Sequence, residues 1–176
     1  MFSCEHHHVA EIWPLSGLKV QTEVSPSPKP TPLGMYPARV DDKGRLKLPV
    51  DIEEFLKGER LFVTSLDGRV GRIYPLPVWQ ENEKILFNDV DDPEGAEDLH
   101  MMADKYGSAA QVDPQGRVLL SPVLRRKMGV ENQPVQLRHY QGVIHIYNAE
   151  TYDEKERRAE VNAPDALKTF RRKGIK

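Results

Sequence analysis

The sequence predicts an α+β protein in which two similar β-hairpin units lie in tandem and carry short flanking helices. Three observations predict this class: a motif that occurs twice, turns that contain glycine, and short stretches in which apolar and polar side chains alternate. The motif reads Asp-Asp-Lys-Gly-Arg-Leu-Lys-Leu-Pro at residues 41–49 and Asp-Pro-Gln-Gly-Arg-Val-Leu-Leu-Ser at residues 113–121, an offset of 113 − 41 = 72. The chain has 176 residues, 39% of them apolar, which is enough to form a packed core.

Each unit is expected to open with a hairpin whose turn is the repeated motif. A short strand at residues 38–40 or 110–112 leads into the turn, and the alternation after the turn predicts a second strand. A short helix follows each hairpin, because proline suits a first helical turn and glycine suits a helix end. These helices are expected at residues 50–57 and 122–128, with Ser121 as an N-cap and with Gly58 and Gly129 as the terminating glycines.

A second hairpin is expected after each of these helices. Its two-residue turns fall at Asp67-Gly68 and Gln141-Gly142, where glycine supplies the positive φ that such a turn requires. Polar helices at residues 78–87 and 150–161 close the two units, and a third helical stretch at residues 93–103 lies between them.

The chain therefore divides into five expected parts. They are a disordered Pro/Ser-rich extension at residues 1–34, a first unit at 35–80, an acidic helical connector at 81–106, a second unit at 107–162 and a basic C-terminal tail at 163–176. Met35 is an alternative start of the protein. The extension holds Cys4 and a run of three histidines, but a cluster in a mobile tail lacks the geometry of a metal site, so no metal or other cofactor is expected.

Charge is unevenly distributed along the chain. The formal net charge is −2, yet residues 76–106 hold nine acids against two lysines, a local balance of −7, which leaves −2 + 7 = +5 for the remainder. The single cysteine excludes a disulfide framework and indicates a reducing, cytoplasmic compartment. No apolar run approaches the roughly 18 residues of a membrane span, so no membrane partner is expected.

The repeated motif can present an arginine from a rigid turn. Gly44 or Gly116 permits the turn, and Asp41 or Asp113 at its start can accept backbone N–H bonds. Strand alternation that sends the neighbouring apolar residues inward sends Arg45 and Arg117 outward, where a guanidinium can bond phosphate or the edge of guanine. The alternative is an internal Asp–Arg ion pair that only fixes the turn, but two copies at hairpin tips favour nucleic-acid binding.

These residues resemble the MraZ family, whose mark is a duplicated Asp-x-x-x-Arg sequence in two AbrB-like units. The likeness covers about residues 35–160 and includes Leu66-Asp67-Gly68, the stretch Ile73-Tyr74-Pro75-Leu76 and Trp79 as well as both motifs. The resemblance implies swapped hairpins that interlock the two units as a pseudo-dimer within one chain, and ring-shaped homo-oligomers. It also implies a nucleoid-associated, sequence-specific transcription regulator that binds direct repeats of double-stranded DNA upstream of the division and cell-wall gene cluster.

The resemblance places the motif arginines on the surface that faces DNA. The predicted DNA-binding residues are Arg45, Arg117, Lys43, Lys47 and Arg39, and the predicted turn-fixing residues are Asp41, Gly44, Asp113 and Gly116. The outward face of the first unit is more basic than that of the second, which offers Gln111, Gln115 and Leu119 beside Arg117. We therefore expect the first unit to contribute more of the affinity for phosphate.

Two other functions are alternatives to DNA binding. The first is an AbrB-like antitoxin or scaffold that binds a protein partner, but such antitoxins usually have one hairpin unit, and here both units are complete. The second is an enzyme, but the sequence has no Ser-His-Asp, paired-carboxylate, Gly-rich phosphate-binding or Cys/His spacing of the kind that a catalytic site needs. His139 and His145 invite a metal or catalytic interpretation, but the expected hairpin register puts them on opposite faces. Tyr74, Tyr147 and Trp79 are expected in the core, and no catalytic activity is expected.

Overall fold

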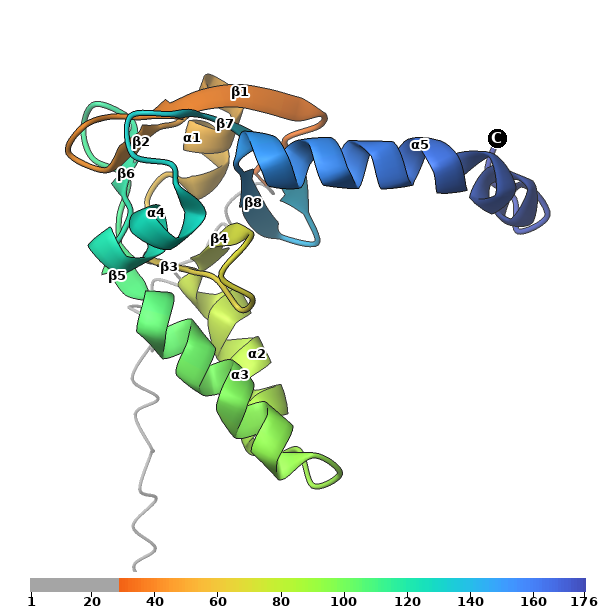
Figure 1. The fold of residues 1–176 in the computed structure, drawn as a ribbon, viewed down its shortest axis with the longest axis horizontal. Coiled ribbons are helices and arrows are strands. Elements are labelled where there is room, and N and C mark those ends of the chain that lie inside the picture. The colour runs from red at the N-terminus through yellow and green to blue at the C-terminus, as the bar shows by residue number, and fades with distance from the viewer. Residues whose placement is uncertain (1–28) are drawn as a thin grey trace, which may run out of the picture.

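The computed structural model describes residues 29–176 and shows one curled antiparallel sheet with five helices around it (Figure 1). The predicted extension at residues 1–34 falls almost wholly outside the described residues. The strands are β1 (Met35–Val40), β2 (Arg45–Lys47), β3 (Leu61–Thr64), β4 (Gly71–Pro75), β5 (Ser108–Ala110), β6 (Arg117–Leu119), β7 (Pro134–Tyr140) and β8 (Val143–Tyr147). The helices are α1 (Val50–Leu56), α2 (Leu76–Phe87), α3 (Pro93–Tyr106), α4 (Pro122–Met128) and α5 (Ala149–Arg171).

Strands from the two halves of the chain alternate in the sheet. The eight strands lie in the order β5-β3-β4-β8-β7-β1-β2-β6, so four of the seven neighbouring pairs join a strand before α2 to a strand after α3. At the β2–β6 pair, Leu46 lies opposite Val118, and both side chains are completely buried. Because the same core takes residues from both halves, neither half can bury its apolar face without the other.

The turn predicted at Gln141-Gly142 is confirmed. Gln141 and Gly142 both have positive φ, 51° and 78°, as a type I′ turn requires. The register follows as predicted, with Arg138 opposite His145 and Tyr140 opposite Val143.

The two-residue turn predicted at Asp67-Gly68 is wrong. The strands β3 and β4 are joined by a loop of six residues, 65–70, because Thr64 ends β3 and Gly71 begins β4. The Asp67 carboxylate accepts the backbone N–H groups of Arg69 and Val70 and the hydroxyl of Ser65. These bonds hold a wider loop in one conformation, which removes the need for a tight turn.

Helix signals in the sequence located α4 correctly. The Ser121 hydroxyl accepts the N–H of Leu124, and Gly129 ends the helix with a φ of 65°, in the left-handed region. Other expected bounds were wrong. The strand expected at residues 110–112 is β5 at Ser108–Ala110, and it pairs with β3 while β6 pairs with β2, because the sheet interleaves the two halves. The helix α5 continues to Arg171 instead of ending at residue 161, and β1 begins at Met35 instead of residue 38, where it pairs with β7.

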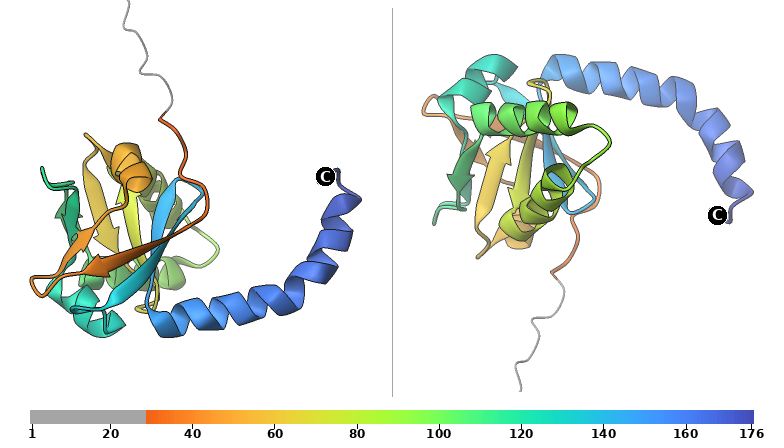
Figure 2. Two further views of the ribbon diagram at one scale, coloured as in Figure 1. Left: turned by 90° about the horizontal axis from the view of Figure 1, so that it is seen from above. Right: turned by 90° about the horizontal axis from the view of Figure 1, so that it is seen from below.

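Two elements project from the curled sheet in different directions. The pair α2 and α3 forms a helical hairpin on one side, and α5, which contains Pro164, leaves the sheet as a long bent arm (Figures 1 and 2). Tyr74 and Trp79 anchor the base of the helical hairpin in a second apolar cluster with Ala103 and Val143, as their predicted place in the core requires. In the described part of the chain, no helix has both the length and the apolar character needed to cross a bilayer.

Candidate nucleic-acid interface

Both copies of the repeated motif fold into the same hydrogen-bonded turn. The Asp41 carboxylate accepts the backbone N–H of Lys43 at 2.9 Å and that of Arg45 at 2.8 Å. The Asp113 carboxylate makes the equivalent bonds to Gln115 and Arg117, both at 2.9 Å. Each aspartate therefore fixes its turn by accepting two N–H groups, as predicted.

The hydrogen bonds of the turn keep both aspartates ionised. The backbone N–H of Arg45, together with its side chain, outweighs the effect of burial and lowers the pKa of Asp41. For Asp113, burial alone would raise the pKa, but the bonds from Arg117 and Gln115 outweigh it and lower the pKa. Charged carboxylates accept stronger hydrogen bonds, so the turns are stiffest in the ionised state.

Each motif arginine forms an ion pair with the aspartate of its own turn, as the alternative to DNA binding expects, but the arginine side chain stays partly exposed. The Nε of Arg45 donates to Asp41 at 2.8 Å, and the Nε of Arg117 donates to Asp113 at 2.8 Å. The two arginine side chains remain 31% and 26% exposed. Among residues 29–176, the terminal nitrogens of Arg45 have no hydrogen-bond partner, and one of those of Arg117 donates to Gln115. The ion pair thus orients each guanidinium and leaves its outer edge open to solvent.

The structure brings both motif arginines to one surface. In the β2–β6 pair, Arg45 lies opposite Leu119 and Lys47 lies opposite Arg117, while the residues between them point into the core. The outward side chains border a shallow hollow of about 460 Å³. Its lining residues are Arg39, Asp41, Asp42, Arg45, Lys47, Arg117 and Asn132. A two-stranded ribbon with paired arginines is a form that the DNA major groove accommodates.

The three other predicted DNA-binding residues, Arg39, Lys47 and Lys43, differ in the hydrogen bonds that their side chains make. Arg39 donates to the backbone and side-chain oxygens of Asn132 at 2.9 and 3.0 Å. Lys47 donates to the carbonyl of Gln115 at 2.6 Å, so it ties the second turn to the first unit. Lys43 is exposed at the tip of the first turn and lies outside the hollow.

The side chains that lie against the glycines of the two turns carry opposite charges, which the two motifs alone do not reveal. Arg125 of α4 packs against Gly44 and donates to the carbonyl of Lys43 at 3.2 Å, whereas Glu53 of α1 packs against Gly116. Both glycines have a positive φ that other residues rarely adopt, 78° at Gly44 and 70° at Gly116, and a Cβ there would also require the facing side chain to shift. Glu53 and Arg125 are equivalent positions of the repeat, since 125 − 53 = 72, and aligning the helices as well as the motifs would have revealed the exchange.

Comparison with known proteins identifies the family. A transcriptional regulator MraZ from Acidobacterium capsulatum is 35% identical over 122 residues, which cover 68% of this chain and 83% of the relative. The chain belongs to the MraZ family. Other MraZ transcriptional regulators match as well: one from Thermomicrobium roseum is 33% identical over 104 residues (58% of this chain, 72% of the relative), and one from Burkholderia cenocepacia is 32% identical over 139 residues (74% and 92%). No family model matches the chain.

Membership of the MraZ family makes the chain a transcription regulator, the coarser part of the function that the sequence predicted. The match to the Burkholderia cenocepacia protein covers 92% of that relative, so nearly the whole of an MraZ protein has a counterpart in this chain.

The two histidines that invited another interpretation are separated in this MraZ-family fold. His139 packs edge-on against Phe55, with ring centroids 4.9 Å apart, whereas Nδ1 of His145 lies 3.1 Å from the Tyr147 hydroxyl. Burial lowers the pKa of His145 to about 4, helped by the positive charges of Arg72 and other nearby cations. In residues 29–176, no cluster of three or more His, Cys, Asp or Glu side chains could hold a metal ion.

Proposed function

We propose that this MraZ-family chain binds double-stranded DNA in a sequence-specific manner through the outward face of the β2–β6 ribbon. The observation that supports this proposal is that Arg45 and Arg117 border one hollow, each oriented by its own aspartate. Arg45, held by its Nε, has two terminal nitrogens for a bidentate bond to phosphate or to guanine, and Arg117 has the same fork with one terminal nitrogen also bonded to Gln115. The proposed function is binding rather than catalysis.

The proposed architecture is a pseudo-dimer of two AbrB-like units with swapped hairpins. The alternation of strands from the two halves in the sheet supports it, as does the equivalence of the two motif turns. The proposed units are residues 35–80 and 107–162, joined by the acidic connector at 81–106. Such a pseudo-dimer would present two arginine turns to one DNA site from a single chain.

The proposed DNA ligand is a set of direct repeats upstream of the division and cell-wall gene cluster, bound in the cytoplasm by a nucleoid-associated homo-oligomer that closes into a ring. An operator made of direct repeats suits a homo-oligomer, because each chain of the oligomer can bind one repeat. In this proposal, the affinity for the operator is high because several chains of the ring bind several repeats at once.

DNA binding can be tested by fluorescence polarisation with duplex DNA from upstream of the chain's own operon. The double variant Arg45→Ala/Arg117→Ala should lose at least about a hundredfold in affinity, since each bidentate contact contributes on the order of 1–3 kcal/mol. Arg157→Ala, which removes an exposed arginine from α5, is the matched control and should bind as the wild type does. Wild-type affinity in the double variant, or equal binding of a shuffled duplex, would contradict the proposal.

A further inference from the structure

Two projecting features of the chain carry opposite charge. The first is the α2–α3 pair, here called the acidic hairpin, which holds the balance of −7 over residues 76–106. The second is a hollow between α5 and the sheet, here called the basic recess and defined by Arg72, Arg138, Tyr147, Lys155 and Arg158. The helices of the acidic hairpin and the helix α5, which borders the basic recess, project away from β2 and β6 (Figures 1 and 2).

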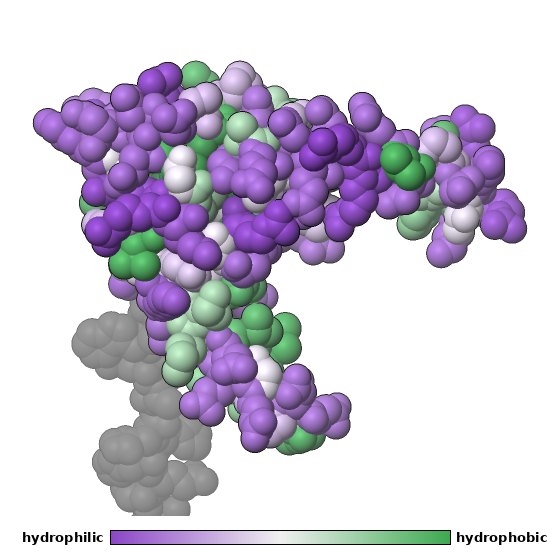
Figure 3. Space-filling view, in the orientation of Figure 1, coloured by the Kyte–Doolittle hydropathy of each residue, from purple (hydrophilic) through white to green (hydrophobic). Residues whose placement is uncertain are grey.

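The acidic hairpin exposes apolar side chains along its length. Phe87 is 70% exposed and Met101 is 62% exposed, and green apolar residues stand among the purple ones on the projecting hairpin in Figure 3. A hollow of about 460 Å³ lies between the two helices, lined by these two side chains together with acidic ones. The acids in the lining are Asp89, Glu97 and Asp104. An exposed apolar surface with a charged rim is typical of a protein-binding site.

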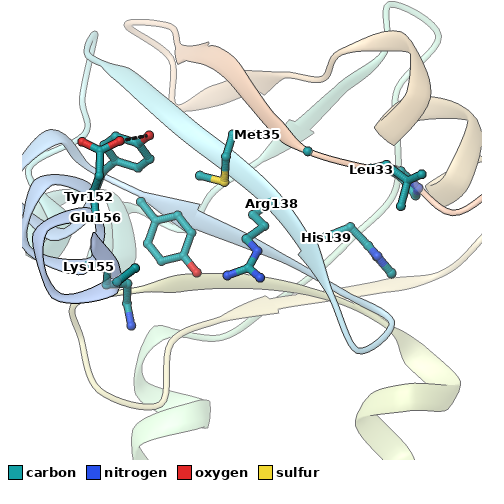
Figure 4. A pocket seen from close by; sticks show the side chains of 11 residues that line it. Leu33, Met35, Arg138, His139, Tyr152, Lys155 and Glu156 are labelled. Carbon is teal, nitrogen blue, oxygen red and sulfur yellow. Dashed lines mark hydrogen bonds between the residues drawn. The ribbon is translucent and has the colours of Figure 1, made fainter. Parts of the chain in front are cut away.

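The basic recess gathers cations that few acids neutralise. It has a volume of about 500 Å³, with Arg72 and Arg138 on the sheet side and Lys155 and Arg158 on α5. Among residues 29–176, the only ion pair that any of these four cations makes is that of Arg72 with Asp67, at 3.4 Å. Figure 4 shows Arg138 and Lys155, which also line a neighbouring hollow of about 490 Å³ beside the start of β1.

The helix α5 extends the basic recess as an uncovered arm. Thr151, in its first turn, is its one buried residue, and residues 153–171 are all exposed. Apolar side chains recur on one face at helical spacing, namely Ala159, Ala163, Ala166, Leu167 and Phe170. An isolated helix is marginally stable in water, so an arm of this length is expected to gain stability from a partner that covers this face.

We propose that the acidic hairpin of one chain docks into the basic recess and along the α5 arm of a second copy. Charge complementarity selects this occupant, because the hairpin supplies carboxylates and apolar side chains where the recess supplies cations and an uncovered apolar face. The hairpin and the arm diverge from the sheet, so the contact joins different chains (Figure 1).

The two surfaces are different parts of the chain, so the contact is head-to-tail. Repetition of a head-to-tail contact produces a closed ring or an open filament, according to the rotation that it imposes. The inference therefore deepens the proposed homo-oligomer, on which it rests, by naming the surfaces that join its chains.

Charge reversal tests the contact. In sedimentation velocity runs on the full chain, Arg158→Glu in the recess and Glu97→Arg on the hairpin should each raise the dissociation constant of the assembly at least about tenfold. In a mixture of the two single variants, the Glu97→Arg hairpin meets the Arg158→Glu recess with both charges reversed, and the other contact keeps its native charges. In the double variant every contact has both charges reversed, so the mixture and the double variant should each regain assembly. Arg157→Glu is the matched control, because Arg157 precedes Arg158 on the same helix and lines neither hollow. Both positions are exposed, and circular dichroism should show unchanged folding for every variant.

Removal of an apolar contact provides a second measurement. Phe170→Ala should weaken assembly severalfold without altering DNA binding per chain, since Phe170 is half exposed and distant in sequence from the motif turns. Assembly that resists all these substitutions would overturn the docking contact while leaving DNA binding and the homo-oligomer intact. A wild-type chain that stays monomeric would overturn both the contact and the oligomer. Loss of DNA affinity in Arg158→Glu with unchanged assembly would instead make the recess a DNA contact and overturn the proposal.

Discussion

The two motif turns have the same backbone and opposite charges beside them. Asp41 and Asp113 make matching bonds to backbone and arginine, but α4 presents Arg125 to the first turn and α1 presents Glu53 to the second. The side chain against the glycine of the first turn is therefore a cation, which also pairs with Glu131, whereas the one against the glycine of the second turn is a carboxylate, which also pairs with Lys47. The comparison shows that duplication preserved the geometry of the turn while its electrostatic surroundings diverged.

The largest expected effect concerns the junction that the two turns share. Leu46→Ala should lower the free energy of unfolding by about 2–5 kcal/mol, because Leu46 is completely buried and packs opposite Val118 of the other half. Val118→Ala should act on the same single transition. Urea unfolding followed by circular dichroism and by fluorescence should give coincident curves, whereas two separate transitions would show that the halves fold independently.

Exchange of the charges beside the turns should have the next largest effect. If DNA binds at the ribbon as proposed, Arg125→Glu should lower DNA affinity about tenfold or more, because it puts a carboxylate beside the first turn, where the phosphates would lie. Glu53→Arg should raise affinity severalfold by the same reasoning. Arg126→Glu is the matched control, since Arg126 is the next residue of α4 and bonds only to the carbonyl of Pro122 among the described residues. Equal losses at positions 125 and 126 in polarisation measurements would show that only net charge matters.

A third difference between the halves predicts a pH dependence. Arg72 and His145 lie opposite each other in the β4–β8 pair and precede the equivalent residues Ile73 and Ile146. Burial lowers the pKa of His145 to about 4, below the value of about 6.5 in the unfolded chain, so the unfolded chain binds more protons between these two pH values. Stability from this group is fully present above pH 6.5 and is lost as the pH falls toward 4.

Substitution of His145 isolates this contribution. From pH 6.5 to 5 the wild type should lose about 1 kcal/mol more than His145→Gln, which keeps a neutral side chain beside Tyr147. Urea unfolding at both pH values measures the difference. Parallel losses in the two proteins would show that His145 titrates normally.

The smallest expected effect concerns the turn between β7 and β8. Gln141→Gly should stabilise the chain by about 0.5–1 kcal/mol, because Gln141 has a φ of 51° that glycine adopts without a clash. The matched control is Gln136→Gly in the strand β7, which should destabilise the chain. A destabilised Gln141→Gly would mean that the glutamine side chain contributes more than its backbone strain costs.

Local signals in the sequence predicted the elements whose determinants are local. Ser121 and Gly129 define α4, and Gln141-Gly142 sets a hairpin register, because each acts within a few residues of itself. The β3–β4 loop was missed because Asp67-Gly68 matches a two-residue turn, whereas the Asp67 carboxylate accepts bonds from Ser65, Arg69 and Val70 and so stabilises a longer loop. The extent of α5 was missed because Pro164 was expected to lie in a tail, whereas the helix continues through it with a bend.

The candidate site was predictable in its residues and less so in its surroundings. The repeat indicated both arginines and both aspartates, since they recur at a fixed offset. The motif also allows an ion pair between each arginine and its aspartate, and the structure shows that this ion pair coexists with partial exposure of the arginine side chain. Arg125 was missed because its contact with the first turn joins residues 82 positions apart, which only the strand pairing between the halves brings together.

The most direct test compares Arg45→Ala and Arg117→Ala, one at a time, in polarisation measurements on operator DNA over a range of salt concentrations. Both arginines lie on the β2–β6 ribbon, so both variants should bind DNA more weakly and with a shallower dependence on salt. The larger loss is expected for Arg45→Ala, because only the first turn is flanked by Arg125. Equal losses would contradict the unequal roles of the two turns, and no loss in either variant would contradict the ribbon as the DNA-binding surface.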